Sequence, residues 1–139
     1  MASTFEVKWV YPPNWDGALP QYGGWKRVIF NLVGVVDTDT ETRVRKLDID
    51  SLQCSSGGVP VRTVVEWVQY NVQGTGEAKL EWERAGYPLI CVMSGQGKFD
   101  WRKSGGNADP GSSGDITGDI LFTSDASYNV TLSVRLKDD

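Results

Sequence analysis

The segment Tyr128-Asn-Val-Thr-Leu-Ser-Val-Arg-Leu-Lys137 alternates between apolar and polar residues from end to end. Successive side chains of a β-strand point to opposite faces of its sheet, so this period of two places one set in a core and the other in water. The segment therefore predicts a strand of an antiparallel sheet with one buried face and one solvated face.

Similar apolar runs recur along the chain, and turn signals from sixteen glycines and six prolines separate them. The run at 60–72 also fits one face of a helix, but its many β-branched residues favour a strand. Further strands are predicted at 5–11, 26–37, 42–49, 77–83, 88–93, 98–102 and 116–123. With about eight strands and no convincing helix, the predicted fold is all-β: a single antiparallel β-sandwich or jelly roll.

The sequence also predicts the conformation of several turns and loops and of one strand interruption. Gly34 interrupts the strand at 26–37 and predicts a bulge or a close approach. The turn at 124–127 is expected to join the last two strands as a hairpin. Residues 103–114 predict a flexible surface loop, because so polar a segment buries too little apolar area to offset its ordering entropy. The charge-laced strand at 42–49 is expected at a sheet edge.

The length of 139 residues suits one domain. Residues 12–24 contain Pro-Pro, Asn-Trp-Asp-Gly, Leu-Pro and Gly-Gly, which indicate an irregular arm. We therefore divide the domain into an N-terminal strand and arm at 1–24 and a β-sandwich at 25–139.

The charge balance is mildly acidic, with 14 Lys and Arg against 18 Asp and Glu and a net charge of −4. Nucleic acids and anionic membranes both select basic surfaces, so neither is an expected partner. No apolar run approaches the roughly 18 residues of a spanning helix, and the first residues lack the pattern of a signal peptide. Cys54 and Cys91 are therefore interpreted as free thiols, with a disulfide between them as the alternative.

The chain has no histidine, which is the usual general base and the commonest metal ligand. We therefore expect no enzymatic activity, no catalytic residue and no cofactor or metal. Four carboxylates could in principle form a glycosidase pair, but each alternates with apolar residues and is interpreted as part of the wet face of a sheet. These residues are Glu66, Glu81, Glu83 and Asp100.

An acidic run at Asp37, Asp39 and Glu41 has the alternate spacing with which calcium loops begin. An EF-hand loop then needs a glycine and a glutamate at positions where this chain has Thr42 and Asp48. The run is therefore interpreted as a solvated hairpin turn between two strands, with a calcium site as the alternative.

Six tryptophans and five tyrosines are the feature that most suggests binding. The tryptophans at strand positions are predicted to lie mostly in the core: Trp9, Trp67, Trp82 and Trp101. The aromatic residues that flank or occupy the arm are predicted to bind a partner: Tyr11, Trp15, Tyr22 and Trp25. Trp15→Ala is expected to weaken such binding roughly 30-fold without changing the melting temperature. If the arm packs on its own domain instead, stability falls and binding holds.

Three stretches carry a resemblance to a known class of proteins. They are Trp25-Lys-Arg-Val-Ile29, Ser55-Ser-Gly-Gly-Val-Pro-Val61, and Thr117-Gly-Asp-Ile-Leu-Phe-Thr-Ser124 followed by the segment 128–137. In these the chain resembles the small virion structural proteins of tailed bacteriophages, especially head decoration or cement proteins.

The resemblance implies a compact, helix-poor protein that docks on the major capsid protein or another virion protein. It further implies a homo-oligomer that is made in the host cytoplasm and resides in the virion. The function expected from the sequence is therefore non-enzymatic stabilisation of a protein shell. The alternative is a carbohydrate-binding β-sandwich module that uses exposed Trp and Tyr side chains.

Overall fold

The computed structural model describes residues 3–11, 27–36, 40–47, 62–111 and 117–137, and the chain in these ranges is all-β. Its only helical element there is a single 3₁₀ turn, η2 at Arg102–Ser104. No helix in the described part of the chain has the length and hydropathy needed to cross a membrane. The predicted all-β class is confirmed.

The first sheet has the strand order β1-β2-β10-β4-β7, and all of its pairs are antiparallel. A short sixth strand, β8, pairs with β4. The strands are β1 (Thr4–Tyr11), β2 (Arg27–Val35), β10 (Tyr128–Lys137), β4 (Arg62–Val72), β7 (Gln96–Asp100) and β8 (Asn107–Ala108).

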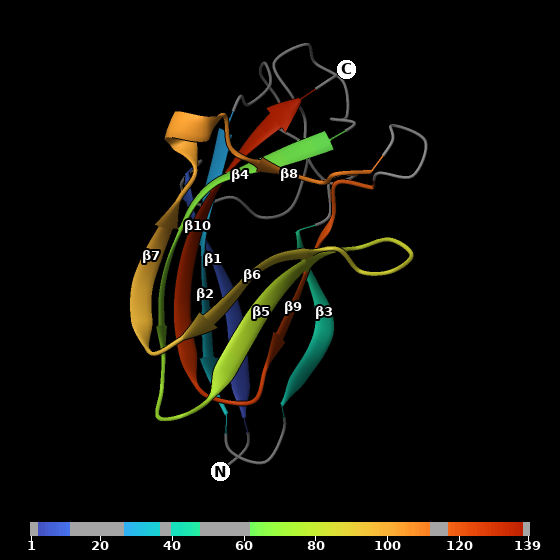
Figure 1. The fold of residues 1–139 in the computed structure, drawn as a ribbon. Coiled ribbons are helices and arrows are strands. Elements are labelled where there is room, and N and C mark those ends of the chain that lie inside the picture. Colours follow the sequence, from blue (N-terminus) through green and yellow to red (C-terminus); the bar gives the residue numbers. More distant parts are fainter. Residues whose placement is uncertain (1–2, 12–26, 37–39, 48–61, 112–116, 138–139) are drawn as a thin grey trace.

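The second sheet has the order β3-β9-β5-β6 and is also antiparallel. Its strands are β3 (Glu41–Leu47), β9 (Ile120–Ser124), β5 (Glu77–Trp82) and β6 (Leu89–Ser94). Figure 1 views the sandwich along one flank, with the first sheet on the left and the second on the right.

The strand pairs are nested, because β2 pairs with β10, β3 with β9, β4 with β7 and β5 with β6. The chain can be described as a long antiparallel hairpin that turns back between β5 and β6. When this hairpin wraps around the core, its successive strand pairs fall alternately in the first sheet and in the second sheet. This wrap is the jelly roll, so the structure resolves the predicted choice between sandwich and jelly roll. The wrap uses eight strands, and β1 and β8 are additions to its first sheet.

The core fills the space between the sheets with the inward side chains of both. Alternation in β10 buries Val130, Leu132 and Val134, as the sequence predicts. In β5 the same alternation buries Ala78, Leu80 and Trp82, which is the largest fully buried side chain. The core members with no exposed surface include Val28, Phe30, Leu32, Val65, Val68, Met93, Ile120 and Phe122.

Gly34 is a point of close approach, as predicted. A Cβ atom placed on it would lie 2.4 Å from Cε1 of Tyr128, which is its partner in the neighbouring strand. Glycine at this position lets the tyrosine ring lie flat against β2 and point into the sandwich.

The prediction of a hairpin between the last two strands is wrong. β9 belongs to the second sheet and β10 to the first, so residues 125–127 carry the chain from one sheet to the other. The polar groups of this turn bond elsewhere: the Glu77 N–H donates to Asp125 and the Val36 N–H donates to Ser127. The connection between β2 and β3 also crosses between the sheets, which contradicts the predicted hairpin at the acidic run.

The predicted flexible loop at 103–114 is also partly wrong. Residues 103–108 contain the end of η2 and the strand β8, which pairs with Val64 and Val65 of β4. Asp109 is 8% exposed and accepts hydrogen bonds from Nε of Arg84 at 2.9 and 3.0 Å. A buried ion pair therefore fixes a segment whose composition suggests disorder, while residues 112–114 lie outside the described part.

Candidate functional site

The outer face of the first sheet is rich in uncharged polar side chains. Cross-strand register aligns Asn31, Thr131 and Gln69 in one row over β2, β10 and β4. The next row contains Asn129, Asn71 and Gln96 on β10, β4 and β7. We call this surface the amide face: Asn31, Gln69, Asn71, Gln96, Asn129 and Thr131.

Asn31 organises the middle of the amide face. Its Nδ2 donates to Oδ1 of Asn129 at 2.7 Å and lies 2.9 Å from Oγ1 of Thr131. Since the amide oxygen of Asn129 is occupied in this way, its NH₂ group is left to point away from Asn31. The cross-strand contact thus fixes the orientation of exposed donors on β10.

The three remaining amides are exposed and unengaged. Gln69, Asn71 and Gln96 make no side-chain hydrogen bond to another residue that the structure describes. They line a hollow of about 580 Å³, together with Asn129 and Thr131. A second hollow of about 290 Å³ adjoins it and shares Asn71 and Asn129, so one depression runs along this face.

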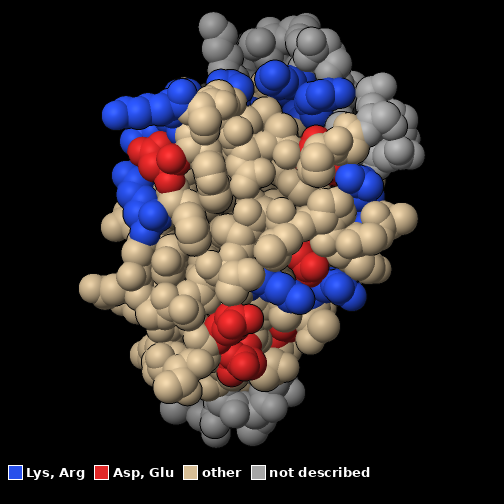
Figure 2. All heavy atoms as spheres, viewed as in Figure 1, with Lys and Arg blue, Asp and Glu red and all other residues tan. Residues whose placement is uncertain are grey.

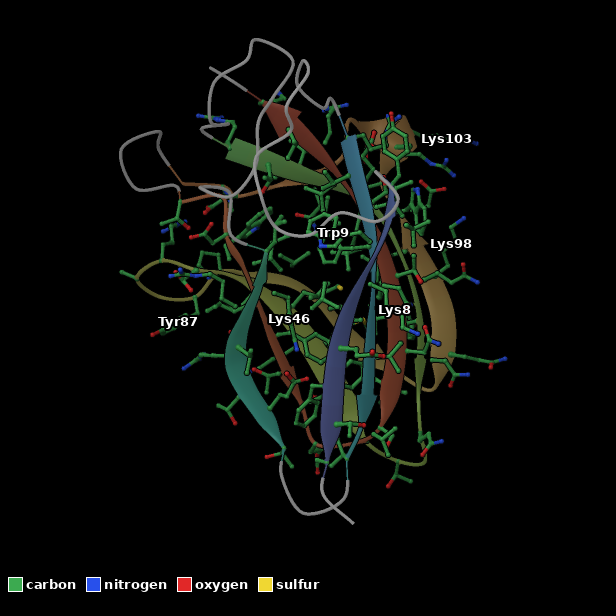
Figure 3. The ribbon with its side chains drawn as sticks, turned by 180° about the vertical axis from the view of Figure 1, so that it is seen from behind. Lys8, Trp9, Lys46, Tyr87, Lys98 and Lys103 are labelled. Atoms are coloured by element: carbon green, nitrogen blue, oxygen red, sulfur yellow. The ribbon has the colours of Figure 1, made fainter. Side chains whose placement is uncertain are left out.

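Charged side chains lie only at the two ends of the first row. Lys8 on β1 is the register partner of Asn31, and Lys98 on β7 is the partner of Gln69. Lys8 pairs with Glu6 at 3.7 Å, and Nζ of Lys98 lies 5.5 Å from the ring centre of Trp67. Figure 3 shows both lysines on the outer side of the first sheet. The centre of the amide face carries no formal charge.

Trp67 and Glu66 close one end of this face. Trp67 lies on the outer side of β4 and is half-buried, so the prediction that it belongs to the core is wrong. Glu66 is the bulged residue beside it and accepts two hydrogen bonds from the Arg27 guanidinium, from Nε and, at 3.0 Å, from Nη2. These bonds, aided by Ser133 and the charge of Arg135, hold the pKa of Glu66 below its usual value.

The outer face of the second sheet is charged. Arg43 donates to Glu81 at 3.3 Å, Arg45 bonds Glu83, and the Arg43 guanidinium lies 3.8 Å from the ring centre of Tyr87. Each cation on this face thus faces a carboxylate or a ring. Binding any ligand here would first break one of these contacts.

The two open flanks of the sandwich are apolar. At the β6 edge of the second sheet, Leu89 and Val92 are 55% and 39% exposed and face outward, because their register partners are Glu81 and Lys79. The β6–β7 flank itself carries the half-buried rings of Phe99 and Trp101. These two rings stack at 5.5 Å with an interplanar angle of 4°. Figure 2 looks onto this flank, whose centre is uncharged while Lys, Arg, Asp and Glu gather around its margin.

The opposite flank lies between β1 and β3. Val7 and Val10 on β1 are 38% and 52% exposed, and Val44 on β3 is 38% exposed. The ring of Trp9 packs on Phe30 at 5.4 Å and holds β1 against the core. β1 is the edge strand of the first sheet, and β3 approaches its inward face, where Nζ of Lys46 lies 5.8 Å from the ring centre of Phe5.

Comparison with protein-family models, curated proteins and solved structures finds no match.

The aromatic residues predicted to bind a partner are only partly described. Tyr11 ends β1 after a bulge, is the register partner of Ile29 and is 46% exposed. Trp15, Tyr22 and Trp25 lie outside the described residues, and so does the rest of the arm. Trp82 lies in the core as predicted, and Trp9 and Trp101 pack against the core from the two flanks.

The four candidate carboxylates are divided between the two sheets, with Glu66 and Asp100 on the first and Glu81 and Glu83 at β5 of the second. Glu66 faces outward from the first sheet and Glu81 from the second, so both layers of the sandwich separate them. Both residues are only 5% exposed, which corrects the prediction that they lie on wet faces. Arginine partners allow this burial: Arg27 bonds Glu66 and Arg43 bonds Glu81.

The acidic run does not lie wholly at the surface either. Asp37, Asp39 and Asp48 fall outside the described residues, whereas Glu41 is 4% exposed at the start of β3. Its carboxylate accepts hydrogen bonds from Lys46 and from the Tyr128 hydroxyl across the core. Both carboxylate oxygens of Glu41 therefore take part in hydrogen bonds within the protein. No group of three or more potential metal ligands is present in the described ranges.

Cys91 is a free thiol, and only 6% of it is exposed. Burial raises its pKa to about 12, so the thiol remains protonated at neutral pH. Its predicted alternative partner, Cys54, lies outside the described part of the chain.

Sequence reasoning missed the amide face. Asn129 and Thr131 occupy predicted wet positions of the strand at 128–137, whereas Gln96 precedes the predicted strand at 98–102. The pattern within one strand also does not say which strands are neighbours. The available signal was composition: Gln69 and Asn71 on β4, and Asn129 and Thr131 on β10, are successive uncharged polar residues at alternate positions.

Proposed function

We propose that this chain is a non-enzymatic structural protein of a phage virion, a decoration or cement protein that stabilises the capsid shell. The observation that carries the proposal is the pair of apolar flanks at opposite ends of the jelly roll. The jelly roll is also an architecture of viral capsid domains, which supports the proposal only by analogy of fold.

Two flanks on opposite sides let one copy contact two neighbours. Unlike patches that meet head to tail give rings or lattices, whereas one patch that meets its own copy gives a closed dimer. In a shell, each copy would bury the β6–β7 flank on one subunit and the β1–β3 flank on the next. The second contact is then intramolecular, so weak interfaces add up to firm attachment.

The exposed edge of β1 supports the same role. No described strand pairs with the outer edge of β1, and edge strands of this kind accept strands from other chains. Glu6 and Lys8 interrupt its apolar residues, which limits unspecific pairing.

The test is co-sedimentation of the purified chain with shells assembled from the major capsid protein of the same genome. We expect saturable binding, and we expect Leu89→Asp to weaken it at least tenfold, because the charge must be desolvated at the contact. Asn71→Asp adds the same charge on the amide face and serves as the matched control. Absence of binding to the shells, or equal loss with both variants, would refute the proposal.

A further inference from the structure

The amide face carries the chemistry of a second binding surface that is separate from the flanks. Its exposed groups are the side-chain amides of Gln69, Asn71, Gln96 and Asn129. Each amide offers two N–H donors and one carbonyl acceptor in a fixed plane. A sugar hydroxyl is likewise a donor and an acceptor at once, so adjacent hydroxyls on a pyranose ring match an amide with two complementary hydrogen bonds.

The distribution of charge on the amide face favours a neutral ligand. Between Lys8 and Lys98 the row crosses Asn31, Thr131 and Gln69 with no ionised group. Lys8 is paired with Glu6. Lys98 lines one end of the hollow, where its ammonium lies over the Trp67 ring. An acidic polymer would need several cations along its path, and between the two ends of the row there is none.

The shape of the amide face favours an extended, chain-like ligand. The row crosses five strands, and four inter-strand spacings amount to about 19 Å, which is room for several linked sugar rings. The two adjoining hollows give the path a floor. Trp67 stands next to the row on β4 and carries Lys98 over its ring, so its indole is a fluorescent group at the margin of the hollow.

The backbone positions that carry the amides are fixed in advance, and the Asn129 amide is also held, which lowers the entropy lost on binding. Strand register fixes the spacing of the rows, and the contact from Asn31 fixes the Asn129 amide. A protein partner fits less well, because interface hot spots are large apolar or Arg anchors in desolvated pockets and this hollow is lined by small amides.

We propose that the amide face binds a neutral, hydroxyl-rich polysaccharide across β2, β10, β4 and β7. Gln69, Asn71 and Gln96 supply hydrogen bonds, Asn31 positions Asn129, and Trp67 lies at the margin of the site beneath Lys98. This inference does not depend on attachment to a shell, because it uses an outer sheet face and leaves both flanks free.

The experiment screens the purified full chain against an array of neutral and acidic glycans. The array includes linear glucan, mannan, xylan and galactan oligosaccharides, with polygalacturonate and heparin as acidic members. We expect saturable binding to at least one neutral chain, and a change in tryptophan fluorescence that is reduced in Trp67→Phe. Binding to no neutral glycan, or to acidic glycans alone, would overturn the proposal.

The double variant Gln69→Ala/Asn71→Ala tests whether the sugar binds on the amide face. Both side chains are exposed and make no described hydrogen bond, so the fold should be unaffected. We expect a loss of affinity of about tenfold, or about 1.4 kcal/mol. Thr123→Ala on the outer face of the second sheet is the control, with unchanged affinity. Equal affinity of the double variant and the wild type would place the sugar elsewhere and refute the assignment. Shell binding by the double variant should be normal, which separates this result from the docking proposal.

Discussion

A buried ionic contact ties the two sheets together, and its removal gives the sharpest test of the fold. Glu41 at the start of β3 receives hydrogen bonds from Lys46 on the same strand and from Tyr128 on β10. Only 4% of Glu41 is exposed, and only 6% of the Lys46 side chain. Nζ of Lys46 lies 5.8 Å and 6.0 Å from the ring centres of Phe5 and Phe122. The surroundings of this ion pair are therefore apolar, and Figure 3 shows Lys46 at the inner side of β3.

The perturbation is Lys46→Met, which keeps the apolar stem and removes the ammonium group. Glu41 then remains in the interior as a carboxylate with one neutral donor. Breaking a buried pair in this way costs about 3–5 kcal/mol. This is a large share of the roughly 5–15 kcal/mol that stabilises a typical domain.

Tyr128→Phe removes the other donor and should cost about 1.5–3 kcal/mol, as expected for a hydrogen bond to a charged group. Burial, together with the bond to Glu41, raises the pKa of Tyr128 well above its ordinary value. A raised pKa in the folded state contributes stability below the ordinary phenol pKa of about 10, and that stability is lost as the pH rises further. The tyrosine therefore remains a donor at neutral pH.

The assay is urea unfolding followed by tryptophan fluorescence, with the midpoint and the slope compared between variants. The matched control is Lys8→Met, because Lys8 pairs with Glu6 at 3.7 Å and the two side chains are 61% and 64% exposed. The control should change the free energy of unfolding by less than about 0.5 kcal/mol. Replacing Glu41, Lys46 and Tyr128 together by Leu, Met and Phe should recover much of the loss, because no buried charge remains. If Lys46→Met costs no more than Lys8→Met, the contact is not buried as described and the reasoning is wrong.

Three further predictions concern other residues. Gly34→Ala should destabilise the protein by about 1–3 kcal/mol in urea unfolding, because its Cβ would overlap the Tyr128 ring at 2.4 Å; Val35→Ala next to it is exposed and should cost far less. Arg27 holds the pKa of Glu66 below its usual value, so this carboxylate stabilises the fold above its unfolded pKa of about 4.3 and loses that contribution as the pH falls. Between about pH 5 and pH 3 the wild type should therefore lose more stability than Glu66→Gln, and parallel losses would contradict the contact. Cys91, with its pKa raised to about 12, should resist iodoacetamide in the native protein and react in urea, as read by mass spectrometry; rapid native alkylation would show that it is accessible.

Local pattern in the sequence determined the strands and their buried faces. Alternation in 128–137 and in β5 predicted which side chains enter the core, because the two faces of a strand are a property of the strand alone. The β-branched residues of 60–72 correctly favoured a strand over a helix. The edge position of β3 also followed from its charges, which discourage further pairing.

Tertiary structure decided which strands are neighbours. The tight turn at 125–127 has the composition of a hairpin, yet it crosses between the sheets, because nothing local distinguishes the two connections. The burial of Glu66 and Glu81 depends on arginines that are distant in the sequence, and Glu41 accepts a hydrogen bond from Tyr128 in the other sheet. The amide face likewise exists only because register aligns four strands whose order is 2-10-4-7. Strand pairing joins residues that are distant in the sequence. The sequence of one strand therefore predicts which side chains lie on each of its faces, whereas the jelly-roll topology determines which strands are its neighbours.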